Sequence, residues 1–141
     1  MKKIIIFAAL AVSGCMGRPI ETTVPFNAQE VAYINQSGAA DVEGQAFLRQ
    51  QGGGVVTCAG ETAFLIPAGQ YATQRMTQIY GNLQGGKVAV SQGSSGENLD
   101  PNYEKMMRKA TCDAEGDFTF NNVANGDYYV ATAVTWTVGN A

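Results

Sequence analysis

The stretch DAEGDFTFNNVANGDYYVATAVTWTV, residues 113–138, decides the fold class of this chain. Apolar and polar residues alternate along residues 117–120 and again along residues 128–138, which is the period of a β-strand with one buried face. Asn125-Gly126 lies between the two segments and favours the positive backbone φ of a tight turn. We therefore expect an aromatic hairpin. The apolar face of its second strand consists of Tyr128, Val130, Val134, Trp136 and Val138.

A hairpin alone is barely stable in water, so a second sheet has to cover it, and an antiparallel β-sandwich is the economical architecture. Residues upstream supply the strands. Residues 42–49 alternate in the same way, residues 50–54 predict a flexible turn, and residues 55–57 form a short extended piece. Residues 62–66 are nearly all apolar, which predicts a central strand buried on both sides and ended by Pro67.

Two helices are expected outside the strands. Asn27 resembles a helix N-cap with Glu30 in the capping-box position, which predicts a short helix over residues 28–36. Apolar residues at helical spacing predict a second helix over residues 71–80, with Gly81 as its C-cap.

The region of residues 70–107 is long for a loop of a sandwich, and long insertions tend to carry function. After the second helix, residues 87–90 predict a strand and residues 91–100 a loop. Asp100-Pro101 then predicts the start of a helical turn with proline at its first position. The chain must become extended again before Cys112.

Composition excludes several classes of function. The chain has 141 residues, enough for one domain, with 9 basic and 12 acidic residues and a formal charge of -3. This balance argues against a nucleic-acid partner, because phosphate binding needs a basic surface. The sequence contains no histidine, which removes the usual general base and the commonest metal ligand. We therefore expect no catalysis, no metal and no cofactor.

The N-terminus has the form of an export signal. Lys2 and Lys3 precede a nine-residue apolar run, Ile4 to Val12, which is too short to cross a bilayer as a helix. Val12-Ser13-Gly14-Cys15 resembles the bacterial lipoprotein box, which implies cleavage before Cys15 and its lipidation. The alternative is a plain secretory signal that contains a cysteine.

The lipoprotein resemblance implies a signal peptide over residues 1–14 and a lipidated tether over residues 15–26. The helix predicted over residues 28–36 makes residues 27–41 a short helical lead-in to the sandwich. A membrane is then a partner through the lipid. The family's sorting rule retains proteins with Asp after the cysteine at the inner membrane. Met16 stands there instead, which implies the outer membrane of a Gram-negative envelope.

Cys58 and Cys112 remain as one pair if Cys15 carries lipid. Each follows a threonine at the end of an extended segment and precedes a turn, so the two ends can meet in an oxidising compartment. A disulfide is expected, and two buried free thiols are the alternative.

Two segments resemble carboxypeptidase-regulatory-like domains. The first comprises residues 43–49, Thr57-Cys58-Ala59-Gly60 and the strand residues 64–68. The second, Cys112 to Val130, follows the family pattern D-x-x-G-x-F-x-F-x-x-(V/L)-x-x-G-x-Y-x-(V/L). The resemblance implies an all-β fold over residues 42–141: an antiparallel seven-strand prealbumin-like sandwich with one or two short helices in insertions. Many members have one more strand after the tyrosine-rich one, so we expect an open sheet edge here that a partner strand could complete.

Sharper site hypotheses concern few residues. Aromatic and arginine side chains in or beside the insertion form a candidate binding patch. Its residues are Tyr71, Arg75, Tyr80, Tyr103 and Arg108. The alternative is that Tyr71 and Tyr80 simply cover the sandwich. The acidic turn at residues 113–117 fits a solvated β-turn better than a calcium loop.

Two further activities of related proteins do not fit this sequence. The transthyretin-like hydrolases use histidine, which is absent, and the Lys–Asn isopeptide of related adhesin repeats needs a first-strand lysine, where Arg49 stands. The predicted function is a lipid-anchored, non-catalytic structural or protein-interaction module of the cell envelope, with another envelope protein as partner. The alternative is a lipoprotein that binds a small ligand or glycan through residues 70–107.

Overall fold

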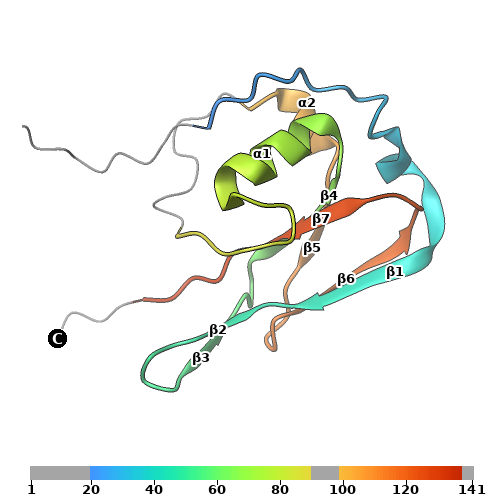
Figure 1. Ribbon diagram of the computed structural model, residues 1–141. Helices are drawn as coiled ribbons and strands as arrows, with labels where there is room; N and C mark the ends of the chain where they lie inside the picture. The colour runs from blue at the N-terminus through green and yellow to red at the C-terminus, as the bar shows by residue number, and fades with distance from the viewer. Residues whose placement is uncertain (1–19, 90–98, 138–141) are drawn as a thin grey trace, which may run out of the picture.

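The computed structural model describes residues 20–89 and 99–137, and in these residues it contains seven strands (Figure 1). The elements in chain order are η1 (Ala32–Asn35), β1 (Ser37–Gln45), β2 (Phe47–Arg49), β3 (Val55–Thr57), β4 (Thr62–Pro67), α1 (Gln70–Tyr80), α2 (Pro101–Lys105), β5 (Arg108–Thr111), β6 (Asp117–Val123) and β7 (Tyr128–Ala131). All strand pairs are antiparallel. The predicted all-β sandwich with one or two short helices is confirmed.

Two layers enclose the main hydrophobic core. One layer pairs β1 with β6, and the other has the order β5-β4-β7. Phe118 and Phe120 of β6 meet Leu65 of β4 between the layers, and these side chains are almost completely buried. The β2-β3 hairpin continues from the end of β1 and extends away from the two layers (Figure 1).

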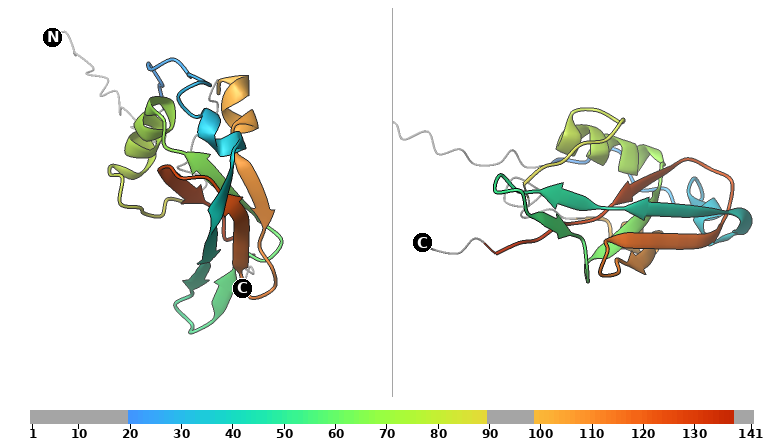
Figure 2. Two further views of the ribbon diagram at one scale, coloured as in Figure 1. Left: turned by 90° about the vertical axis from the view of Figure 1, so that its right-hand side faces the viewer. Right: turned by 90° about the horizontal axis from the view of Figure 1, so that it is seen from below.

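A second core lies on the outer face of the three-stranded sheet. There α1 and α2 pack over β4 and β7, on the side of the sheet that faces away from β1 and β6 (Figure 2). Ile66 of β4 contacts this cluster, whereas Leu65 contacts the first. The prediction of a central strand buried on both sides is therefore confirmed for β4.

The segment predicted as one strand over residues 42–49 has the predicted faces but is divided between β1 and β2 at Ala46. Residues at positions 42, 44, 46 and 48 are partly buried, and the residues between them are exposed. Gly44 matters because the Phe118 ring lies over it: a Cβ built there would stand 2.4 Å from the ring. β1 begins at Ser37, ahead of the expected residue 42.

The predicted aromatic hairpin is wrong. β6 pairs with β1 and β7 pairs with β4, so the two strands lie in different layers. Residues 124–127 carry the chain from one layer to the other, and the Tyr128 hydroxyl donates to the Ala124 carbonyl at 2.9 Å across this connection. Alternation specifies which face of a strand is buried, but it does not specify the partner strand.

The second predicted strand is also shorter than expected. β7 ends at Ala131, and Val130 and Trp136 are 44% and 47% exposed, although both were expected on the buried face. Val130 is exposed because β7 is an edge strand in the described part of the chain.

The predicted helix over residues 28–36 is replaced by a turn and the short 3-10 helix η1. The Asn27 side chain accepts the Gln29 N–H at 3.0 Å, which forms a local turn rather than a helix cap. Glu30 does not complete a capping box. Its carboxylate accepts the N–H of Gln70 at 3.2 Å and caps α1 instead.

The other helices are confirmed. α1 ends at Gly81, whose φ of 73° is left-handed, and α2 begins after Asp100, whose side chain accepts the Asn102 N–H at 2.8 Å. The strand expected over residues 87–90 does not form in residues 87–89. Cys15 and the signal, the loop over residues 91–98, Val90 and Val138 lie outside the described residues.

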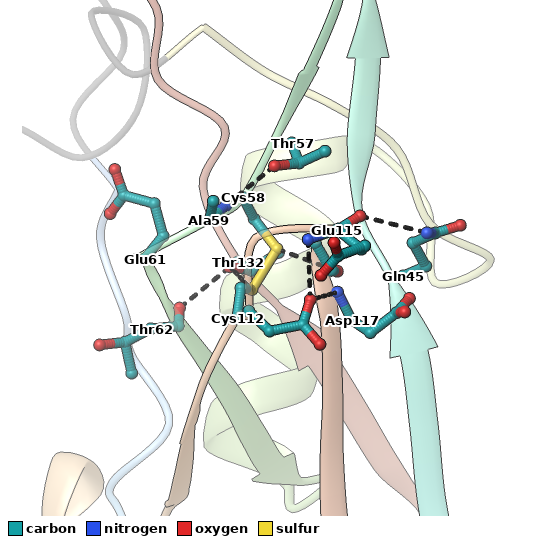
Figure 3. The surroundings of a disulfide bond; sticks show 12 residues. Gln45, Thr57, Cys58, Ala59, Glu61, Thr62, Cys112, Glu115, Asp117 and Thr132 are labelled. Atoms are coloured by element: carbon teal, nitrogen blue, oxygen red, sulfur yellow. Dashed lines mark hydrogen bonds between the residues drawn. A yellow bond between two sulfur atoms is a disulfide. The ribbon is translucent and has the colours of Figure 1, made fainter.

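The predicted disulfide joins Cys58 to Cys112, with Cα atoms 5.7 Å apart (Figure 3). Both residues are buried, and the bond links the turn before β4 to the turn after β5. Thr132 adjoins it, since its hydroxyl lies 3.7 Å from the Cys112 sulfur and donates to the Thr62 carbonyl at 3.0 Å. The bridge therefore holds together the start of β4, the end of β5 and the chain after β7.

Candidate functional site: a tyrosine groove beside the edge strand

Three of the five predicted patch residues converge under the helices. The Tyr71 and Tyr103 ring centroids are 4.8 Å apart, and the Arg75 guanidinium lies 5.5 Å from the Tyr103 centroid. Phe26 closes the cluster with edge-on contacts to both tyrosines. Tyr71, Arg75 and Tyr103 are each at most 6% exposed.

This cluster holds the helices on the sheet. The Tyr71 hydroxyl accepts the Asp100 N–H at 3.1 Å, and Asp100 in turn caps α2. A cavity of about 360 Å³ lies beside it, bounded by residues 20–26, α1 and residues 99–100. The coverage interpretation, which concerned Tyr71 and Tyr80, therefore applies to Tyr71, and Tyr103 is buried in the same cluster.

Arg108 and Tyr80 lie elsewhere. Arg108 is on β5, where its guanidinium donates to the Asn121 carbonyl at 2.6 Å and links the two layers. Tyr80 ends α1 at the other end of the helix from Tyr71. The five residues do not form one patch.

Tyr80 belongs instead to a groove of about 220 Å³ between the end of α1 and β7. We call it the tyrosine groove. Its lining consists of Met76, Tyr80, Asn82, Leu83, Gln84, Gly85, Gly86, Tyr128, Tyr129, Val130 and Ala131.

The loop after α1 forms one wall of the tyrosine groove and is tied to the helix end. Asn82 Oδ1 accepts the N–H groups of Gln84 and Gly85 at 2.9 and 3.1 Å, and its Nδ2 donates to the Tyr80 carbonyl at 3.1 Å. Gly86 lies against the Tyr80 ring, because a Cβ built there would be 3.2 Å from it. The wall is thus a short turn built around the Tyr80 ring.

The opposite wall is β7. Tyr129 turns toward α1, where its hydroxyl lies 2.9 Å from the Thr73 hydroxyl. Tyr128 turns toward the main core, where its ring packs edge-on against Tyr33 at 5.4 Å. Tyr80, at the end of α1, and Tyr129, on β7, are both partly buried and pack against the second core.

The groove lining is uncharged. Among the described residues that line it there is no carboxylate, lysine or arginine, while amide groups are present at Asn82 and Gln84.

Burial raises the pKa of Tyr128 and of Tyr33 above the ordinary value. Both phenols therefore stay neutral at physiological pH, and Tyr33 donates to the Asp127 carbonyl at 2.8 Å.

Sequence reasoning selected Tyr80 but missed the rest of the tyrosine groove. The alternation of residues 128–138 places Tyr128 and Tyr129 on opposite faces of a strand, and no sequence pattern singles out Asn82 or Gln84. The signal that was present is the Gly81 cap followed by Gly85-Gly86, a pattern for a turn that returns toward the helix.

The acidic turn is used for its own backbone. Asp113 Oδ1 accepts the N–H groups of Glu115 and Asp117 at 3.0 and 2.9 Å, and the Asp117 carbonyl accepts the Asp113 N–H (Figure 3). No group of three or more metal-ligating side chains is found in residues 20–89 and 99–137.

Within those same ranges, none of the helices has the length and apolar character needed to traverse a bilayer.

No protein-family model matches the sequence, and no curated protein matches it significantly. The chain is similar to a crystal structure described as a "putative carbohydrate binding protein" from Pseudomonas aeruginosa. The two share 28% identity and superpose with a TM-score of 0.63, over 82% of this chain and 77% of the other.

Proposed function

We propose that this protein is a lipid-anchored cell-envelope protein that binds carbohydrate, without catalysis, in the tyrosine groove. Lipid on Cys15 would hold it to the membrane, in the outer membrane of a Gram-negative cell if the sorting rule of bacterial lipoproteins applies. The observation that carries the proposal is the uncharged lining that combines tyrosine rings with side-chain amides.

This lining has the chemistry that a sugar requires. The C–H-rich face of a pyranose packs on the electron-rich face of an aromatic ring, and an amide such as that of Gln84 both donates to and accepts from sugar hydroxyl groups, whereas the Asn82 amide holds the turn together. The absence of charge from the described lining favours a neutral saccharide over a uronic or sialic acid. A groove of about 220 Å³ suits one or two sugar units rather than a long chain.

The similar structure from Pseudomonas aeruginosa supports the same ligand class, because its description names carbohydrate binding. Cleavage of a glycosidic bond needs two carboxyl groups that flank it. The described residues lining the groove include none, which supports binding without hydrolysis.

The test is a glycan array followed by calorimetry with the best neutral sugar. Tyr80→Ala removes the ring from the groove and is expected to weaken binding about tenfold, equivalent to about 1.4 kcal/mol. Tyr80→Phe keeps the ring and retains most of the affinity. Phe47→Ala is the matched control, since Phe47 is 44% exposed on β2, away from the groove.

Binding that survives Tyr80→Ala, or an array without any hit, would overturn the groove as a sugar site. The anchor is tested separately. Cys15→Ser is expected to move the protein from the membrane fraction to the soluble fraction, and a variant that stays in the membrane fraction would show that lipid on Cys15 is not the anchor.

A second candidate is a protein partner that extends the β5-β4-β7 sheet. Ala68 N donates to the Asp127 carbonyl at 2.9 Å, so alternation along the ladder turns the main-chain groups of Tyr128 and Val130 away from β4. A partner strand would pair with this edge. Val130→Pro removes the outward N–H, and the partner hypothesis requires that it abolish capture of an envelope protein while Val130→Ala does not.

A further inference from the structure

The chain that leads to Cys15 is fastened to α1. Gln74 Oε1 accepts the N–H groups of Thr23 and Val24, both at 3.0 Å, and its Nε2 donates to the Thr23 hydroxyl at 2.8 Å. One turn later, Gln78 Nε2 donates to the Glu21 carbonyl at 2.7 Å. The segment expected to be a free tether is therefore docked as far as Glu21, beside the C-terminal half of α1.

The remaining distance to the anchor is short. Four residues lie between Cys15 and Ile20, and the five steps along the chain from one to the other span at most about 17 Å when fully extended. Lipid on Cys15 would keep the C-terminal half of α1 within that distance of the membrane. This limit rests on chain length alone.

One stretch of sequence on this side of the molecule contains no acidic residue. The chain has 12 acidic residues, but none lies between residues 70 and 89, which form α1 and the loop after it. The loop presents Lys87 together with two exposed apolar side chains, Leu83 at 46% and Val88 at 38%. Figures 1 and 2 place this loop and the blue segment that begins the described chain on the α1 side of the sheet.

We propose that α1 and the loop of residues 81–88 form the membrane-facing surface of this protein, with Lys87 at anionic lipid headgroups and Val88 in the interfacial layer. The proposal rests on the anchor of the proposed function. Residues 82–86 of this loop also line the tyrosine groove, so its test is placed on Lys87 and Val88, which lie outside that lining. A basic residue among apolar ones suits the surface of an anionic bilayer, and the acid-free stretch avoids repulsion from it. Glu21 is the acidic side chain of the docked segment.

The single tryptophan of the chain makes a direct test available. In a Trp136→Phe background, Val88→Trp places the reporter on the proposed surface and Val55→Trp places it on the β2-β3 hairpin, at a site that is also exposed. The experiment uses the chain from Cys15 to Ala141, which contains all the residues that the structure describes. With Cys58 and Cys112 bonded, its one free thiol couples chemically to maleimide lipid in vesicles of phosphatidylethanolamine and phosphatidylglycerol.

Spin-labelled lipid is expected to quench Val88→Trp several-fold more strongly than Val55→Trp, with a blue shift of emission at position 88 only. Adding Lys87→Glu should reduce the difference, and adding Gln74→Ala with Gln78→Ala should remove most of it by releasing the docked segment. Equal quenching at positions 88 and 55 would overturn the proposal. Because coupling is chemical, that result does not depend on whether cells lipidate Cys15.

Discussion

The carboxylate of Glu30 accepts the main-chain N–H of Gln70, forty residues further along the chain, at 3.2 and 3.3 Å for its two oxygens. It thereby caps α1, whose own N-cap, Gly69, has no side chain to do so. A negative charge at this position also complements the positive end of the helix dipole.

We expect Glu30→Ala to lower the free energy of unfolding by about 1 kcal/mol, the usual loss when a helix cap is removed. Glu30→Gln keeps an acceptor and should lose less. Urea denaturation measures both values, with Gln29→Ala as the exposed neighbouring control. Equal stabilities for Glu30→Ala and Gln29→Ala would show that the cap contributes nothing.

The disulfide is expected to make a large contribution to stability. It closes a loop with a sequence separation of 54, for which the chain-entropy model gives about 4 kcal/mol. The double variant Cys58→Ser, Cys112→Ser should unfold at much lower denaturant than the parent, and adding reductant should shift the parent alone. Cys15→Ser is the control and should match the parent.

Gly116 and Gly60 provide a matched pair for steric constraint. Both have positive φ, 84° and 79°, but a Cβ at Gly116 would lie 2.6 Å from the Ala46 carbonyl oxygen, whereas a Cβ at Gly60 meets nothing within 4 Å. Gly60→Ala should cost about 1–2 kcal/mol from backbone conformation alone. Gly116→Ala should cost clearly more in the same unfolding assay, and a smaller loss would contradict the close approach.

Stability should fall at alkaline pH because burial raises the pKa of Tyr33 and Tyr128. The unfolded chain releases these protons near pH 10, before the folded protein does, so the contribution is complete below that pH and is lost as pH rises through the folded pKa values. Thermal unfolding between neutral pH and pH 11 measures the loss. The double variant Tyr33→Phe, Tyr128→Phe should show a shallower decline, and an unchanged slope would contradict this assignment.

Local patterns predicted much of the fold. The apolar run of β4, the spacing of α1 with its glycine cap, and the proline-initiated α2 all depend on neighbouring residues, and the structure has each of them. The Cys58–Cys112 disulfide was predicted because each cysteine follows a threonine and precedes a turn, and because these two cysteines remain if Cys15 carries lipid.

Features that depend on distant partners were not predictable in this way. Alternation placed Phe118 and Phe120 inside but could not select β1 over β7 as the partner of β6. Glu30 stood in a capping-box position, yet it caps a helix that only tertiary packing brings near. The tyrosine groove shows the same limit, because Tyr80 and Tyr129 meet only through the packing of α1 on the sheet.

The placement of β6 and β7 in separate layers has a consequence for how the chain folds. Residues 117–131 supply a strand to each sheet, and their partners, β1 and β4, are made long before them. During synthesis from the N-terminus, neither layer can therefore form completely until residues 117–131 have been made. Pairings between strands so far apart in the sequence also make folding slow. Truncation before Asp117 removes a strand from each layer and so exposes both hydrophobic cores. We therefore expect β6 and β7 to complete the two layers in one cooperative step.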